Sequence, residues 1–312
     1  MLDIRRFGAA FIVALALAGC GKSAGSVDDK LPENTSYKLA VMSFNVRNSL
    51  AKGDTGDKQW SNRREGVKKM IVETAPDIIG MQEASAEQRR DLVAMLPDFA
   101  LLEVPNTGTS KGGNTVIMYN TKVLEKVVCK SYYLSSTPNK PSVNGWNTET
   151  QYRTTIWGEF RHRKSGRSFF LADTHMPLYS TVEGNLARMK SAELNVGRMK
   201  EACGEDATVF IVGDMNCSRP EAGLQPYLDW MSSARDKALA SDDIPSFNNY
   251  GGSANSKIDF IFYRNAIPNE FHTVNGSGYG VRYISDHYPV MAKFTVCLLY
   301  TSPSPRDAHE SR

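Results

Sequence analysis

The sequence predicts an α/β fold: a four-layer sandwich in which two packed, mixed and largely antiparallel sheets are flanked by helices. Apolar segments typical of strands and amphipathic segments typical of helices alternate irregularly along residues 37–296. Helices follow some strands and tight turns join others, which favours this sandwich over a doubly wound parallel sheet. No internal repeat and no proline-rich linker interrupts this range, so we expect it to form one domain.

The composition is that of a globular protein. The chain has 312 residues, of which 41% are apolar and 23% are charged, and its formal net charge is +3. These values exclude a disordered chain, a collagen-like repeat and a disulfide-dense mini-protein. The small net charge also argues against a dedicated polyanion-binding protein, which usually carries a strong basic excess.

Strands are expected where short segments are apolar or rich in β-branched and aromatic residues. A turn at Gly166 separates two of them. The segment 208–213 is apolar throughout, so we expect it to be buried on both faces of a sheet. The expected strands are residues 37–46, 77–83, 115–119, 123–134, 154–161, 168–173, 208–213, 257–263 and 288–296.

Three helices are expected, over residues 60–74, 86–96 and 183–203. The first should begin with Ser61 as its N-cap and end before Pro76. The third carries an apolar stripe at spacings of three and four residues, which we expect to face the core. The stripe consists of Leu186, Met189, Ala192, Val196, Met199 and Cys203.

Residues 1–19 have the features of an export signal. Two arginines precede the apolar run 9–18, which is too short to span a bilayer as a helix. The sequence Leu17-Ala-Gly-Cys20 resembles the bacterial lipobox, in which the signal is cleaved before a cysteine whose thiol then carries lipid. An ordinary secretory signal is the alternative.

We therefore expect lipidation at Cys20 and a flexible tether over residues 20–36, which are rich in Gly, Ser, Asp and Asn. The protein is expected in the cell envelope, anchored to a bacterial membrane on its periplasmic side or at the cell surface. Residues 297–312 resemble a peptide translated from sequencing adapter, so we expect a non-native tail there.

Polar residues end or follow several of the expected apolar strands. Buried carboxylates are costly unless they are paired or bound to a metal, so their repetition at strand ends predicts one shared site. Oxygen ligands without thiols suit a hard cation, Mg²⁺ first and Mn²⁺ or Ca²⁺ as alternatives, whereas a zinc site is less well supported. The residues are Asn45, Glu83, His175, Asp214, Asn216, Asp259, Asp286 and His287.

Six short motifs in a fixed order make the sequence resemble the endonuclease/exonuclease/phosphatase superfamily, and within it a secreted bacterial branch. They are S-F-N-V-R at 43–47, I-I-G-M-Q-E at 78–83, D-T-H at 173–175, G-D-M-N at 213–216, I-D-F-I-F at 258–262 and S-D-H-Y-P at 285–289. The resemblance covers residues 37–296 and implies a deoxyribonuclease-like fold for this catalytic domain.

The resemblance also implies roles for the polar residues. Glu83 would be the principal metal ligand, and Asn45 and Asp286 would complete the metal site. Asp214 would orient and partly deprotonate the attacking water, and Asn216 would hold water or phosphate.

Two histidines and two arginines would act on the phosphate. His175 would donate to a phosphoryl oxygen, with Asp259 fixing its tautomer, and His287 would contact the phosphate or assist proton transfer. Arg153 and Arg47 would bind the substrate.

The chain departs from the deoxyribonuclease pattern at one point. Relatives carry a Glu that orients the second histidine, and here that region reads Lys111-Gly-Gly-Asn114. Either Asn114 substitutes, or the partner of His287 comes from elsewhere in the chain.

The resulting expectation is a monomeric, metal-dependent phosphoesterase that hydrolyses a phosphodiester by in-line attack of an activated water. The alternatives are a phosphomonoesterase acting on a small soluble phosphate such as a sugar or inositol phosphate, a nuclease or sphingomyelinase-like enzyme, and an inactive binding lipoprotein. The substrate could therefore be a nucleic acid, a phospholipid head group or a small phosphate ester.

Overall fold

The computed structural model describes residues 36–103, 114–141, 145–147, 152–178, 181–219, 221–252, 255–276 and 278–297. The expected export signal, nearly all of the tether and nearly all of the C-terminal tail lie outside these residues. In the part of the chain that is described, no helix has the length and apolar character needed to cross a membrane.

One sheet has seven strands in the order β10-β12-β13-β1-β2-β4-β3. Its strand β1 (Ser36–Asn45) runs parallel to β2 (Ile78–Ala84) and antiparallel to β13 (Val290–Cys297). The remaining strands are β3 (Phe99–Glu103), β4 (Asn114–Asn120), β10 (Ala240–Ser241) and β12 (Ile267–Thr273).

The other sheet has six strands in the order β5-β6-β7-β8-β11-β9. Strand β7 (Ser168–His175) runs parallel to β8 (Val209–Asp214), which pairs antiparallel with β11 (Asp259–Arg264). The remaining strands are β5 (Leu124–Tyr133), β6 (Thr154–His162) and β9 (Ser232–Ser233).

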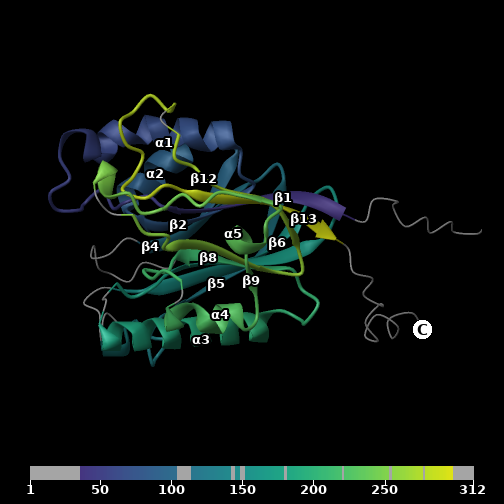
Figure 1. Cartoon of the computed structure of the whole chain (residues 1–312). Coiled ribbons are helices and arrows are strands. Elements are labelled where there is room, and N and C mark those ends of the chain that lie inside the picture. Colours follow the sequence, from purple (N-terminus) through teal and green to yellow (C-terminus); the bar gives the residue numbers. More distant parts are fainter. Residues whose placement is uncertain are drawn as a thin grey trace, which may run out of the picture. The chain divides into compact units, whose positions relative to one another are not determined.

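Helices cover the outer faces of both sheets. Helices α1 (Trp60–Thr74) and α2 (Ala86–Met95) lie over the seven-stranded sheet, and α3 (Val182–Ala202) and α4 (Gln225–Leu228) lie over the six-stranded sheet (Figure 1). The four layers confirm the predicted sandwich. The shorter elements are α5 (Ala234–Lys237) and the 3₁₀ helices η1 (Gly56–Lys58), η2 (Gly145–Asn147), η3 (Ala222–Leu224) and η4 (Asn249–Gly251).

The core between the sheets is aromatic. Phe210 on β8 packs against Phe294 on β13 with 4.8 Å between ring centroids, and Phe169 packs edge-on against Phe210. All three rings are fully buried. Burying such a ring stabilises the folded state by about 1.5–3 kcal/mol, so these contacts hold the two sheets together.

The expected strands and helices are present with shifted ends, but the N-cap of the first helix was predicted wrongly. Helix α1 begins at Trp60, so Ser61 lies inside it, and Gln59 takes the N-cap position without a side-chain bond. Strands β3 and β12 were not among the expected strands. Strand β3 is only partly buried, and β12 contains Pro268 at an irregularity of its pairing, which weakens a strand pattern.

The apolar stripe of α3 was only partly correct. Ala192, Val196 and Met199 are buried as expected, but Leu186 is 44% exposed. The first half of the helix instead buries small and polar side chains, because it packs against the loops that follow β7 and β8. These buried residues are Gly184, Ala187, Arg188 and Ser191.

Strand direction brings the polar strand ends to one rim of the sandwich. The parallel pairs β1–β2 and β7–β8 end there, and the antiparallel strands β11 and β13 begin there. The opposite ends of β1 and β13 meet where Ser36 pairs with Cys297, the first residue of the expected tail. The chain therefore enters and leaves the sandwich at the end opposite this rim.

Candidate active site

Asp214 is the centre of the polar cluster at the rim. It is the last residue of β8 and is 2% exposed. Its Oδ2 accepts a hydrogen bond from Nδ2 of Asn45 at 3.0 Å and lies 3.4 Å from Nε2 of His175 and 3.7 Å from Nε2 of His287. The backbone N–H of Asn216 donates to Oδ1 at 2.9 Å. Four of the predicted residues therefore surround one buried carboxylate.

The close approach of β8 to β7 depends on a glycine, the residue before Asp214. Gly213 has φ +154°, and a Cβ at this position would lie 2.0 Å from the carbonyl oxygen of Thr174. Only glycine lets β8 approach β7 this closely, and the approach sets Asp214 beside His175.

Asp259 pairs with His287, which corrects the predicted pairing of Asp259 with His175. Oδ2 of Asp259 lies 2.8 Å from Nδ1 of His287. The register of β11 on β8 sets Asp259 opposite Asp214, and the Oγ of Ser246 accepts from the backbone N–H of Asp259 at 3.1 Å. The acid partner of His287 thus comes from β11. The side chain of Asn114, the other candidate, lies outside the described residues.

The predicted metal ligands lie on the same rim. Oε1 of Glu83 accepts from Nδ2 of Asn45 at 3.4 Å, and its Oε2 accepts from the N–H of Asn48 at 3.1 Å. Asp286 is 5% exposed, and its Oδ2 lies 3.3 Å from Nη1 of Arg47. These carboxylates and the amide of Asn45 form an oxygen-rich donor set, which fits a hard divalent cation.

A second group of ligand atoms adjoins this set. Among the described residues, single ligand atoms of Asp214, Asp259 and His287 lie within 4.8 Å of one another. Because Asn45 contacts both Glu83 and Asp214, the two groups form one continuous site.

The two histidines differ in charge. Burial lowers the pKa of His287, but the carboxylates of Asp259 and Asp214 outweigh this effect and raise it to about 10. Burial lowers the pKa of His175 well below its usual value, and the charges of Arg153 and His287 lower it further. At neutral pH His287 is therefore cationic and His175 is neutral.

The pKa of Asp214 is also shifted, in the direction that favours its protonated form. Burial raises its pKa to about 7, the nearby charge of Asp259 adds to the rise, and His287 opposes it. A group with a pKa near neutrality is well matched to accept a proton from water.

The remaining predicted residues lie close to this centre. Arg153 is 9% exposed, directly precedes β6 and is close enough to His175 to lower its pKa. Nδ2 of Asn216 donates to the carbonyl of Met176 at 2.9 Å, which ties the loop after β8 to the loop after β7.

Backbone strain is concentrated at the rim. Among the described residues, five that are not glycine have positive φ at this rim, which costs about 1–3 kcal/mol each and is typical of functional sites. They are Arg47 (55°), Glu83 (63°), Asn216 (48°), Asn249 (45°) and Tyr250 (55°).

The segment 246–251 was missed by the sequence analysis. Ser246 supports Asp259, and the ring of Phe247 packs on His287 with 4.9 Å between centroids. The hydroxyl of Tyr250 donates to Oδ2 of Asp54 at 2.9 Å. The segment shows no strand or helix periodicity, so its only signal was a pair of aromatic residues in a polar loop.

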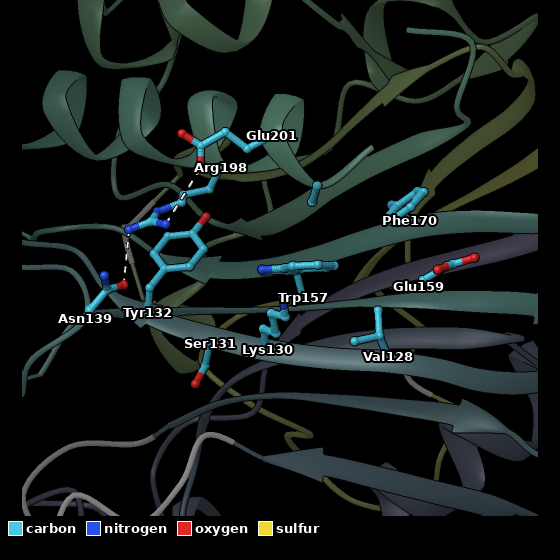
Figure 2. Close-up of a pocket in the computed structure, with 11 residues that line it drawn as sticks. Val128, Lys130, Ser131, Tyr132, Asn139, Trp157, Glu159, Phe170, Arg198 and Glu201 are labelled. Atoms are coloured by element: carbon cyan, nitrogen blue, oxygen red, sulfur yellow. Dashed lines mark hydrogen bonds and ion pairs between the residues drawn. The ribbon is translucent and has the colours of Figure 1, made fainter. Parts of the chain in front are cut away.

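A cavity of about 460 Å³ lies away from this cluster. Figure 2 shows it between the outer face of the six-stranded sheet and the second half of α3, with Trp157 and Phe170 on the sheet and Arg198 on the helix. None of its lining residues belongs to the rim cluster, so the cavity takes no part in the candidate active site.

The comparison with family models matches residues 42–287 to the Endonuclease/Exonuclease/phosphatase family. Among curated proteins, an uncharacterized protein of Acanthamoeba polyphaga mimivirus is 26% identical over 164 residues, which span 51% of this chain and 59% of that protein. The chain thus spans little more than half the length of this relative.

Solved structures share the fold. A family protein of Bacteroides thetaiotaomicron superposes with a TM-score of 0.76 at 26% identity, covering 84% of this chain and 96% of that one. A mannosyl-6-phosphatase of the same organism gives a TM-score of 0.73 at 26% identity, covering 82% and 99%. D. rerio TDP2 complexed with a single-strand DNA product gives 0.63 at 19% identity, covering 82% and 98%.

Proposed function

Because the chain belongs to the Endonuclease/Exonuclease/phosphatase family, a family of metal-dependent phosphoric ester hydrolases, we propose that it hydrolyses a phosphomonoester of a small soluble alcohol such as a sugar. The observation that carries the hydrolytic chemistry is the buried carboxylate of Asp214 in contact with Asn45, His175 and His287. In-line attack on phosphorus needs an activated water and donors to the phosphoryl oxygens, and this cluster offers both.

Asp214 acts as the base. Its pKa of about 7 lets it take a proton from water as the oxygen attacks phosphorus. The new bond forms between water oxygen and phosphorus, the ester P–O bond breaks, the leaving oxygen takes a proton from solvent, and inorganic phosphate and the alcohol are released. The N–H of Asn216 and Nδ2 of Asn45 each donate to one oxygen of this carboxylate and so fix its direction.

The other residues offset charge on the phosphoryl group. His287, held cationic by Asp259, and the neutral His175 donate hydrogen bonds to phosphoryl oxygens. Arg153 and Arg47 add positive charge at the edges of the site. Glu83, Asn45 and Asp286 would hold a divalent cation, which would supply Lewis-acid stabilisation of the developing charge.

The preference for a monoester comes from the comparisons. Among the relatives described above, the mannosyl-6-phosphatase is the protein whose name states an activity and whose identity reaches 26% over nearly its full length. The phosphodiester favoured by the sequence analysis remains the second candidate, because the rim residues named above suit either ester.

A paired assay tests the proposal. We expect the purified protein with Mg²⁺ to hydrolyse p-nitrophenyl phosphate and mannose 6-phosphate faster than bis-p-nitrophenyl phosphate, with EDTA abolishing all three activities. Faster turnover of the diester would replace the monoester proposal with the diester. Absence of metal-dependent activity on every ester would contradict the catalytic function itself.

We also propose that the enzyme works in the bacterial cell envelope, anchored by lipid on Cys20. The proposal rests on the lipobox-like sequence and on the tether that follows it. Strand β1 has ten residues from Ser36 to Asn45, about 33 Å of extended chain, so the tether joins the domain far from the active site. Cys20→Ser should move the protein from the membrane fraction to the soluble fraction, and unchanged membrane association would contradict lipidation.

A further inference from the structure

Arg47 has an unusually fixed guanidinium for a residue at the edge of a site. Nε and Nη2 donate to the two carboxylate oxygens of Asp54 at 3.1 and 3.3 Å, and Nη1 lies 3.3 Å from Oδ2 of Asp286. The side chain keeps 30% of its surface exposed. Since a guanidinium has five N–H groups, two donors remain on the Nη nitrogens after these contacts.

The backbone of Arg47 is fixed as well. Its N–H donates to Oδ1 of Asn45 at 3.0 Å, and its carbonyl accepts from Nη2 of Arg63 at 3.0 Å and from Nε2 of Gln88 at 2.8 Å. Arg63 is itself fully buried. The side chain thus starts from a rigid point, and only its outer end depends on Asp54.

Asp54 is held in turn by Tyr250, which lies 196 residues away along the chain. The Asp54 side chain is 10% exposed and Tyr250 is 6% exposed, so their hydrogen bond is largely shielded from water. Tyr250 also packs edge-on against Tyr283 at 5.3 Å and lies under the ammonium of Lys58 at 5.1 Å. The Asp54–Tyr250 pair therefore joins the loop after β1 to the segment before β11.

The backbone is strained at both Arg47 and Tyr250, and such strain is typical of residues in a functional site. Arg47 and Tyr250 each have φ of 55°, a conformation that bulky side chains rarely adopt. Tyr250 is held there because the N–H groups of Asn248 and Asn249 donate to the carbonyl of Asp286 at 2.9 and 3.0 Å. The segment that carries Tyr250 is thus tied to the residue that Arg47 touches.

We propose that Asp54 and Tyr250 are positioning residues that hold the Arg47 guanidinium for binding a phosphoryl oxygen of the substrate. Asp54 takes two of the donors of Arg47 and so prevents the guanidinium from turning fully onto Asp286. The free Nη donors then face the site, where a phosphate oxygen accepts them. This inference rests on the proposed function, because it assigns Arg47 to the phosphate of the same substrate.

The first test separates binding from turnover. Asp54→Asn removes the charge that fixes Arg47 and should raise KM for the phosphate ester and the inhibition constant of inorganic phosphate about tenfold, the size expected for one charged hydrogen bond, with kcat nearly unchanged. Asp57→Asn is the matched control, because Asp57 lies in the same connection between β1 and α1, is 58% exposed and lies 3.7 Å from Nη1 of the exposed Arg282. It should leave both constants unchanged.

The second test asks whether Asp54 acts through Arg47. In an Arg47→Met background, Asp54→Asn should cause no further loss of phosphate affinity, since the group that it positions is gone. Tyr250→Phe keeps the ring and removes one hydrogen bond, so it should weaken phosphate binding about threefold, whereas Tyr283→Phe should have no effect.

Calorimetric titration with inorganic phosphate and Mg²⁺ gives a readout that needs no turnover. Weaker phosphate binding by Asp54→Asn than by wild type supports the inference, even if no ester is hydrolysed and the proposed function fails. Unchanged phosphate affinity in Asp54→Asn, or an equal loss with and without Arg47, would overturn it. The inference would also be overturned if Asp54→Asn bound phosphate as tightly as wild type at saturating Mg²⁺ and differed only in needing more Mg²⁺.

Discussion

Two buried acids in neighbouring strands, Asp214 at the rim and Asp173 just beneath it, differ in what surrounds them. Asp214 meets two imidazoles and an amide at the open end of β8. Asp173 lies between the sheets, is fully buried and accepts a 2.6 Å hydrogen bond from Nε2 of Gln82. Burial is the largest influence on both, and it raises both pKa values.

Burial alone therefore does not give a carboxyl group the pKa near neutrality that proton transfer requires. Near Asp214, the charge of His287 opposes the effect of burial, and the pKa stops at about 7. Asp173 receives hydrogen bonds from Gln82 and from the backbone of Val116 and Thr174, but its pKa remains well above the usual value. Asp173 therefore favours its protonated form more than a free carboxyl does and packs between the sheets, whereas Asp214 can exchange a proton near neutral pH.

The largest effect should come from Asp214→Asn. Removing the base should lower kcat about 10³-fold, within the range for general base catalysis, with the fold retained in circular dichroism. The matched change Asp173→Asn should cost less than about fivefold in kcat, because Asp173 bonds to Gln82 between the sheets and takes no proton from the attacking water. Equal losses of kcat in the two variants would contradict the assignment of a catalytic role to Asp214 and not to Asp173.

The metal-binding side of the rim should set the requirement for Mg²⁺. Glu83→Gln keeps the size of the side chain but removes its charge, so the Mg²⁺ concentration for half-maximal activity should rise more than about tenfold. Titration of activity with Mg²⁺ measures this change, and Glu87→Gln on the adjacent helix α2 is the control. An unchanged Mg²⁺ requirement would remove Glu83 from the metal site.

Asp259→Asn tests the pairing of Asp259 with His287. It should affect kcat more than KM. Without the carboxylate at 2.8 Å, the imidazolium of His287 is less stable, and kcat should fall roughly 10²-fold with KM little changed. The ¹⁵N chemical shifts of the histidine rings give a second readout. They should change for His287 and not for His175, and the reverse pattern would restore the pairing with His175.

The smallest effect concerns stability. Because the folded-state pKa of Asp173 lies above its usual 3.8, the folded protein retains a proton that the unfolded chain releases. The stability contributed by this proton is fully present below the unfolded pKa and is lost as pH rises toward the folded pKa.

Asp173→Asn should remove this loss. The variant should exceed wild type in unfolding free energy at pH 8, with the gap closing toward pH 4. Urea unfolding at several pH values measures it, with the exposed Asp57→Asn as the reference. A gap that widens toward low pH would show that Asp173 is ionised in the folded protein.

The α/β sandwich fold and most residues of the candidate active site could be predicted from the sequence. Apolar periodicity locates strands, and each of Asn45, Glu83, His175 and Asp214 stands at the end of such a strand, so the shared rim follows from strand direction. These are local properties of the chain, and a single sequence records them directly.

The contacts between the site residues became known only from the tertiary structure. Asp259 faces His287 because β11 pairs with β8 in a register that sets Asp259 opposite Asp214, and a shift of one residue would turn its side chain to the other face. Tyr250 meets Asp54 across 196 residues, through loops without periodicity. Contacts between distant segments depend on how whole sheets and loops pack, and the residue pattern of neither segment alone specifies them.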